Sequence, residues 1–253
     1  MAANEPGQPA LTDPAFSRNL DVPARALAVG AHPDDIEFGC GATLAKWAAA
    51  GCEVHHLVLT DGSKGTWDVN ADTSKLVVSR QAEQRDAARR LGATGEVVFL
   101  GWPDGELDSG LRQRWQVSYW IRRLRPDVLL GHDPWKRYRL HPDHRHAGWL
   151  VCDGVVAARD PHFFPEQNLS HHRPKTLLLW EADAPDHVED VEGFVETKLS
   201  ALEAHASQFE STMKAVDPEQ MAAFRQRITT RLAGFGAAHG LAAAEVFKRI
   251  SDL

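Results

Sequence analysis

The sequence is poor in cysteine, with only Cys40, Cys52 and Cys152 along its 253 residues. An odd and small number of cysteines argues against a scaffold held together by disulfides. No two of them form a C-x-x-C pair. We therefore expect all three to be buried packing residues of an ordinary globular core.

Long apolar runs are also missing. No apolar stretch approaches the roughly 20 residues that a membrane-spanning helix needs. Residues 1–21 are polar and interrupted by prolines, without the apolar segment of a secretion signal. These absences predict a cytoplasmic protein with no membrane partner. We expect a flexible N-terminal arm over residues 1–22 and a single α/β domain over residues 23–253.

An excess of positive charge is absent as well. The formal net charge is −7, and the basic residues are scattered along the chain. The densest basic run, from Arg112 to Arg125, alternates with apolar residues and indicates the solvated face of a helix. This balance of charge argues against a nucleic-acid partner.

What the sequence does contain is an alternation of short apolar runs and helical segments, without internal repeats. The apolar runs predict buried strands over residues 25–32, 52–60, 96–101 and 127–132. The segments between them predict helices over residues 39–50, 73–91 and 111–125. Such alternation is typical of a mostly parallel sheet with helices on both faces, so we predict a Rossmann-like three-layer α/β/α fold.

The second half of the chain is less regular. Its pattern predicts a helix over residues 141–158, a loop over residues 161–174 and a strand over residues 175–182. Beyond them we predict only helices, over residues 191–209, 218–232 and 241–250. The fold is therefore expected to end in a helical C-terminal part.

Polar residues follow the predicted strands, at the edge where a parallel α/β sheet binds its ligand. They are His32-Pro33-Asp34-Asp35, Thr60-Asp61, Asp104 and His132-Asp133, in the order of the strands. The sequence thus predicts that the chemistry of the protein takes place at this edge.

The first of these clusters extends from His32 to Glu37. Imidazole and carboxylate both suit Zn²⁺, and Pro33 restricts the turn so that His32 and Asp35 can converge on one point. Three acids this close together need a cation or solvent to offset their repulsion. Alternatively, Asp34 or Asp35 caps the helix that follows. The histidine at the end of a buried strand favours the metal site.

A second cluster, His141-Pro142-Asp143-His144, lies at the start of the helix predicted over residues 141–158. On its own it indicates a polar helix start with surface histidines as readily as a site. Together the two clusters offer three protein ligands and an open position for water, the arrangement of a catalytic zinc site. The remaining His and Asp side chains can do acid–base work.

With these two motifs the sequence resembles the LmbE-like, or PIG-L, family of zinc-dependent deacetylases of N-acetylglucosaminyl substrates. The hallmarks of that family are A-H-P-D-D after the first strand and H-P-D-H after the fourth, here residues 31–35 and 141–144. Further family-like stretches are Thr60-Asp61-Gly62, Arg80-x-x-Glu83 with Leu91-Gly92, Asp104-Gly105 and His205-x-Ser207-Gln208. The resemblance extends from about Arg25 to Gln208.

The resemblance implies a hydrolase that removes the acetyl group from an N-acetylated amino sugar or a related amide, with one Zn²⁺ per chain. His32, Asp35 and His144 would be the zinc ligands. Asp34 would be the general base, taking a proton from water that zinc has made more acidic and later passing it to the leaving amine.

Four further residues receive roles from the same resemblance. His141 would be the electrophilic partner of the tetrahedral oxyanion, and Asp143 would hold His141 in its charged form by a hydrogen bond. Arg80 and Asp104 match positions that hold the sugar or its aglycone. Otherwise Arg80 is an exposed helix residue and Asp104 a turn residue. The partner is then a small acetylated amino sugar or conjugate, and a homo-oligomer is consistent with the family.

Other features bear on the substrate. Ser63-Lys64 stands where the mycothiol branch of the family often has an acid, which argues against an inositol-linked substrate. The loop from Ser63 to Asp72, which contains Trp67, is a candidate lid or subsite wall, and His187 is a candidate pocket residue.

Two other functions remain open on the sequence alone. One is metal-dependent hydrolysis of a phosphoester, which needs a second metal about 3.5–4 Å from the first. Asp34, Asp61 and Asp133 would be its carboxylates. The other is a sugar-binding protein with a vestigial metal site, against which the intact set of base and ligands argues.

Overall fold

The structure, a computed structural model, describes residues 16–253. Within these residues an eight-stranded sheet has the strand order β1-β7-β8-β6-β5-β2-β3-β4. The strands are β1 (Ser17–Arg18), β2 (Arg25–Gly30), β3 (Glu53–Thr60), β4 (Val97–Trp102), β5 (Val128–His132), β6 (Thr176–Trp180), β7 (His187–Asp190) and β8 (Ala244–Ile250). Only β8 runs antiparallel to its neighbours, so the predicted α/β fold with a mostly parallel sheet is confirmed.

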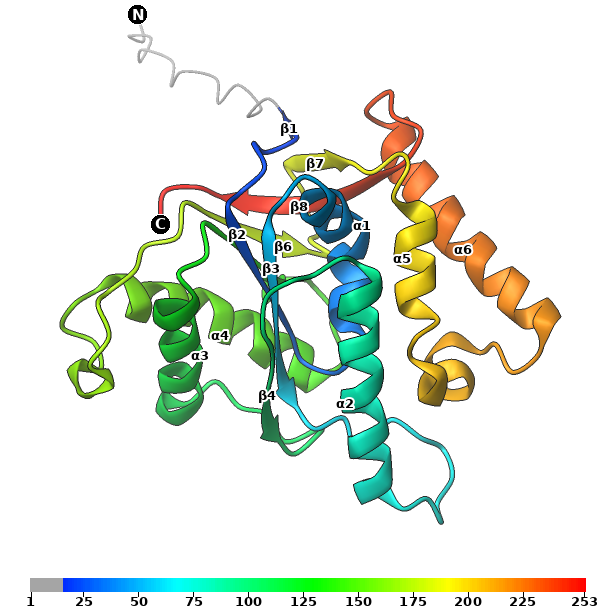
Figure 1. The fold of residues 1–253 in the computed structure, drawn as a ribbon, viewed down its shortest axis with the longest axis horizontal. Coiled ribbons are helices and arrows are strands. Elements are labelled where there is room, and N and C mark those ends of the chain that lie inside the picture. The colour runs from blue at the N-terminus through cyan, green and yellow to red at the C-terminus, as the bar shows by residue number, and fades with distance from the viewer. Residues whose placement is uncertain (1–15) are drawn as a thin grey trace, which may run out of the picture.

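Helices cover both faces of this sheet. They are α1 (Asp35–Ala49), α2 (Thr73–Arg90), α3 (Leu111–Leu124), α4 (Pro142–Arg159), α5 (Val195–Leu202) and α6 (Pro218–Ala237). Figure 1 shows α1, α2, α5 and α6 on one side of the sheet, and α3 and α4 on the other. The layers agree with the predicted three-layer arrangement.

Alternation along β2 explains why both faces are apolar. Successive side chains of a strand point to opposite faces of its sheet. Ala26 and Ala28 pack into the core that includes α1, whereas Leu27 and Val29 pack into the core that includes α3 and α4. Each face is therefore buried beneath helices, as is usual for parallel sheets.

The last predicted helix is wrong. Residues 241–250 were expected to be helical, but Ala244–Ile250 form β8, which lies antiparallel between β6 and β7. The alanines before and within this segment favour a helix on propensity alone. Pairing along both edges of the segment overrides that preference, because it satisfies the backbone groups of two neighbouring strands at once.

The region before β8 also differs from expectation. The helix expected over residues 191–209 is limited to α5, and short 3₁₀ and π turns follow it over Ala206–Gln208 and Phe209–Met213. Strand β7 was not predicted. It pairs with β1, so residues 17 and 18 of the expected arm lie in the sheet. Residues 1–15 of that arm lie outside the described residues.

The solvent exposure of two residues, Cys152 and Arg122, differs from what the sequence predicted. Cys40 and Cys52 are buried as predicted, but Cys152 is only partly so. Arg122, within the basic run expected to be solvated, is buried, and its guanidinium donates to the backbone carbonyls of Ala157 and Phe163. In the part of the chain that the structure describes, no helix is long and apolar enough to cross a membrane.

Candidate metal and active site

The predicted site residues meet where the order of the strands reverses. Strand β2 pairs with β3 on one side and β5 on the other, and ligands of open α/β sheets bind beyond such a switch point. His32 lies just beyond β2, and Pro142 starts α4 at the position where proline is favoured. A cavity of about 450 Å³ opens here, lined by all eight predicted site residues except Asp143.

Donor atoms of three residues from the two motifs lie close to one another. His32 Nδ1 lies 3.3 Å from His144 Nε2 and 3.4 Å from Asp35 Oδ2. His144 Nε2 lies 3.2 Å from Asp35 Oδ1. Tetrahedral Zn²⁺ with bonds of about 2.1 Å separates its ligand atoms by about 3.4 Å. The spacing and chemistry of these donors therefore fit a zinc ion, and all three residues line the cavity.

The other ring nitrogen of His32 faces two carboxylates. His32 Nε2 lies 3.0 Å from Asp143 Oδ2 and 3.1 Å from Asp104 Oδ1. These residues, with His141, make a second cluster of potential ligands. Asp143, however, already accepts hydrogen bonds from the backbone N–H groups of Gly105 and Leu107. We conclude that Asp143 and Asp104 orient the imidazole of His32, as carboxylates beside metal-bound histidines do.

The structure contradicts the predicted hydrogen bond between Asp143 and His141. Among the described residues, the bonds of the Asp143 carboxylate go to His32, Gly105 and Leu107, and none goes to His141. Burial, with the nearby rings of His32 and His144, lowers the pKa of His141 and favours its neutral form. A neutral imidazole retains one N–H donor, so His141 can still donate to an oxyanion.

Opposite charges stabilise the ligand cluster. Burial would lower the pKa of His32, but hydrogen bonds to Asp104, Asp143 and Asp35 raise it well above its usual value. Burial would likewise raise the pKa of Asp35, but His144 and His132 hold it well below the usual range. The buried carboxylates around His32 therefore keep their negative charge, which a metal cation would compensate.

Asp34 lies beside the ligands and lines the same cavity. It is 5% exposed and occupies the position before α1 with φ 107°, a left-handed conformation that costs a non-glycine residue energy. Its side chain makes no capping hydrogen bond to α1, so the capping alternative is wrong for Asp34. Burial raises its pKa to about 6, although the Arg80 guanidinium opposes the shift. A carboxylate in this range suits a general base near neutral pH.

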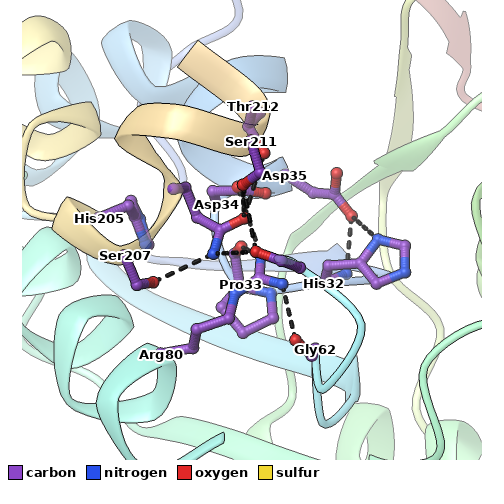
Figure 2. A network of polar contacts seen from close by, with 12 residues as sticks. His32, Pro33, Asp34, Asp35, Gly62, Arg80, His205, Ser207, Ser211 and Thr212 are labelled. Atoms are coloured by element: carbon purple, nitrogen blue, oxygen red, sulfur yellow. Dashed lines mark hydrogen bonds and ion pairs between the residues drawn. The ribbon is translucent and has the colours of Figure 1, made fainter. Parts of the chain in front are cut away.

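Arg80 supports the turn that carries Asp34. Its guanidinium donates to the backbone carbonyls of Pro33 and Gly62 and lies 3.4 Å from Asp34 Oδ2 (Figure 2). Arg80 is buried, so the alternative of an exposed helix residue is wrong. The side chain lines the cavity, but its donors are largely used within the protein.

Gln84 lies four residues after Arg80 on α2 and forms a hydrogen bond with the backbone of Asp34. Its Oε1 accepts the backbone N–H of Asp34 at 2.9 Å, and its Nε2 donates to Glu37 Oε1 at 2.8 Å. Glu37 Oε2 in turn lies 3.2 Å from His205 Nε2, and Gln84 and Glu37 are fully buried. This network is a second constraint on the strained conformation of Asp34.

Replacing Gln84 with alanine should therefore lower kcat about 10-fold while KM and bound metal stay the same. The reason is that a lost hydrogen bond of about 1 kcal/mol lets the base relax from its strained position without touching a ligand. Gln167→Ala is the matched control, because the buried amide of Gln167 donates to Trp115 O and Ser118 Oγ, away from the cavity. Equal kcat values for the two variants, at similar melting temperatures, would exclude a positioning role for Gln84.

Sequence reasoning missed His132 as a site residue, although its place at a strand end was noted. The Nε2 atom of His132 lies 3.2 Å from Asp35 Oδ2, and its Nδ1 accepts from Trp180 Nε1 at 3.0 Å. That acceptor role assigns the proton to Nε2, facing the carboxylate. Trp180 packs so closely on α1 that a Cβ at Gly39 would lie 2.5 Å from its ring. His132 and Trp180 thus set the position of Asp35.

Two other candidates lie apart from the cavity. Trp67 is 77% exposed and does not line it. His187 is buried on β7, where its ring nitrogens face Ser17 Oγ and Glu189 Oε1. Lys64, which stands where the mycothiol branch often has an acid, does line the cavity, and its backbone N–H donates to Asp104 Oδ2.

Residues 27–154 match the family model of PIG-L, described as GlcNAc-PI de-N-acetylase. The diacetylchitobiose deacetylase of Thermococcus kodakarensis is 35% identical over 188 residues, which cover 73% of this chain and 70% of that protein. The 1D-myo-inositol 2-acetamido-2-deoxy-alpha-D-glucopyranoside deacetylase of Streptomyces avermitilis is 33% identical over 167 residues. The match covers 56% of this chain and 56% of that protein, so this chain spans about half of its length.

A solved structure of a diacetylchitobiose deacetylase is also similar to this fold. The structure of N,N'-diacetylchitobiose deacetylase from Pyrococcus horikoshii, in complex with an inhibitor, superposes with a TM-score of 0.82 at 27% identity. The superposition covers 90% of this chain and 84% of that one. The sequence motifs, the architecture and the sequence match agree, and the chain belongs to the PIG-L family.

Proposed function

We propose that this protein is a zinc-dependent deacetylase that removes the acetyl group from an N-acetylated amino sugar or a related amide. One Zn²⁺ per chain is held by His32, Asp35 and His144. The observation that carries the proposal is the cluster of these three residues, in which each pair has donor atoms 3.2–3.4 Å apart, with the buried carboxylate of Asp34 beside it. Membership of the PIG-L family supplies the reaction class, hydrolysis of an acetamide.

When bound, the zinc ion polarises the amide carbonyl and makes water a stronger acid. Asp34 takes one proton from the attacking water, whose oxygen forms the new bond to the carbonyl carbon. His141 donates a hydrogen bond to the oxygen that becomes negative. Asp34 then passes its proton to the departing nitrogen as the C–N bond breaks. Acetic acid and a free amine result, the acid loses its remaining proton to solvent to give acetate, and Asp34 is again ionised.

Asp104 and Arg80 form the part of the cavity nearest to the sugar. Burial would raise the pKa of Asp104, but its hydrogen bond with His32 lowers it to about 2, so the carboxylate is ionised and can accept from a hydroxyl group. Arg80 lines the same cavity while holding the turn of Asp34. The relatives named above act on diacetylchitobiose and on a GlcNAc-inositol, and we propose an N-acetylglucosaminyl group as the shared substrate unit.

The rival hydrolysis of a phosphoester has little support in the geometry. Asp61 Oδ1 accepts from the backbone N–H groups of Ser63 and Asp104, and Asp133 Oδ1 accepts from that of Trp135. Both carboxylates stabilise their own loops. Within residues 16–253, the groups of possible metal ligands contain neither of them.

The proposal is tested by a panel of N-acetylated sugars and aryl phosphate esters, each incubated with the zinc-loaded protein. We expect acetate from at least one sugar and no phosphate or phenol from the esters. Release from an ester alone would contradict the proposal, and so would acetate release that needs two zinc ions per chain. A cytoplasmic location and association into homo-oligomers stay predictions.

A further inference from the structure

A second cavity adjoins the candidate active site. It has a volume of about 620 Å³ and is lined in part by Phe38, Gly39, Glu181 and Arg231. The same four residues also line the first cavity. The two cavities are therefore adjacent, and Arg231 of α6 lines both of them.

The walls of the second cavity are largely apolar. Leu232 and Phe235 come from α6, and Val246 comes from β8. Phe16 lines the cavity from the start of the described chain, and its ring lies 4.3 Å from that of His239. Among residues 16–253, Phe235 remains 39% exposed, so part of this apolar surface is left uncovered by the described chain.

The charged groups of this cavity are mostly paired within the protein. Lys198 Nζ lies 2.6 Å from Glu245 Oε1, and both side chains are buried. Glu245 also accepts from the backbone N–H groups of Ala42 and Thr43, which leaves its carboxylate well satisfied. Glu181, at the junction of the two cavities, is paired with Arg139. Apart from Arg231, which has no ion pair among the described residues, the cavity offers a ligand few free charges, and its largely apolar lining favours an apolar group.

We propose that the second cavity binds an apolar group, alkyl or aryl, that the acetylated amino sugar carries. The inference rests on the proposed function, since it places the sugar itself in the first cavity. It extends that function by naming an amphiphilic substrate: an amino sugar at the metal site with an apolar substituent reaching α6. Burying three or more methylene groups there should tighten binding about 10–100-fold.

Gly234 of α6 offers a way to fill this cavity without disturbing the fold. Gly234 lines the second cavity, and a Cβ built on it meets nothing within 4 Å. In Gly234→Trp a large ring would take up the space proposed for the substituent. Gly234→Ala is the matched control, because it adds only a methyl group and changes the helix at the same position.

Binding of hexyl β-glucosaminide and of glucosamine to the zinc-loaded protein should be compared by calorimetry. We expect the hexyl compound to bind about 10–100-fold more tightly to the unaltered protein and to Gly234→Ala. In Gly234→Trp this advantage should disappear, while glucosamine binds as before. N-hexanoylglucosamine is a second ligand that distinguishes a group entering from the amide side from one entering from the glycosidic side.

Equal binding of glucosamine and both hexyl compounds to the unaltered protein would overturn the proposal. An advantage that survives unchanged in Gly234→Trp would also overturn it. Because these readouts measure binding, they are independent of turnover. Failure to release acetate from any sugar would refute the proposed function and leave a measured preference for the apolar group intact.

Discussion

Replacing Asp34 with asparagine should lower kcat by about 10²–10⁴-fold, while the zinc content and KM change little. Asparagine keeps the shape of the side chain but cannot take a proton from water, and a positioned acid–base group contributes about this much to a rate. Asp34 is not one of the three residues His32, Asp35 and His144 that would hold the metal, so the metal should remain bound. Substrate affinity should survive because the group acts mainly in the transition state.

The control for this variant is Asp133→Asn, which alters another buried carboxylate near the site. Asp133 accepts from the backbone N–H of Trp135 and does not line the cavity, and asparagine can keep that bond. We expect its kcat to stay within about twofold of the original, as for a conservative change away from the reacting atoms. Loss of zinc from Asp34→Asn would make Asp34 a ligand. Unchanged turnover would assign the base to another group.

Replacing His144 with alanine should leave a folded protein that binds zinc more than about 100-fold more weakly. Removing a ligand leaves two protein donors, and even the loss of a group that only orients a ligand costs about 10–100-fold. The side chain of His144 is 25% exposed at the cavity, so its removal creates little buried empty space. Zinc per chain by elemental analysis, with the melting temperature beside it, measures the effect.

His146→Ala is the matched control, because it removes another imidazole two residues along the same helix. The ring of His146 faces Ser109 Oγ at 3.3 Å and does not line the cavity. This variant should keep one zinc per chain and its activity. Full metal occupancy in His144→Ala, or equal metal loss in both variants, would show that the ligand assignment is wrong.

The two motifs predicted the centre of the site because each is short and lies at the end of one element. His32 and Asp35 are three residues apart, and a parallel sheet brings its strand ends to one edge. His144 follows the predicted start of a helix, and its place beside His32 came from the family resemblance. The donor atoms of the three residues are indeed adjacent.

The supporting residues could not be predicted in the same way. Gln84 reaches Asp34 because α2 packs beside the segment that carries Asp34, and nothing in the local sequence specifies that packing. The contact between Asp143 and His32, in place of the expected one with His141, depends on the angle at which α4 begins. Such contacts depend on tertiary packing, whereas composition and periodicity report only on neighbours along the chain.

The same limit explains the error at β8. Periodicity alone distinguishes a short buried strand poorly from a helix, and the alanine-rich start of this segment favours the wrong choice. Strand β8 pairs with β6 and β7, which are distant from it in the sequence, so the residues around the segment do not specify this pairing. The burial of Arg80 was missed for the same reason. A charged helix residue can be buried where backbone carbonyls and a carboxylate pair with it, and these partners come from other parts of the chain.

The central claim is that one zinc ion and this set of residues hydrolyse an acetamide. The most direct measurement strips the protein of metal with a chelator, adds zinc back in steps and follows acetate and free amine from an N-acetylglucosaminyl sugar. The account predicts that both products appear in equal amounts and that the rate reaches its maximum at one zinc per chain. Absence of acetate at every zinc level, or a rate that rises fully only with a second equivalent, would contradict it.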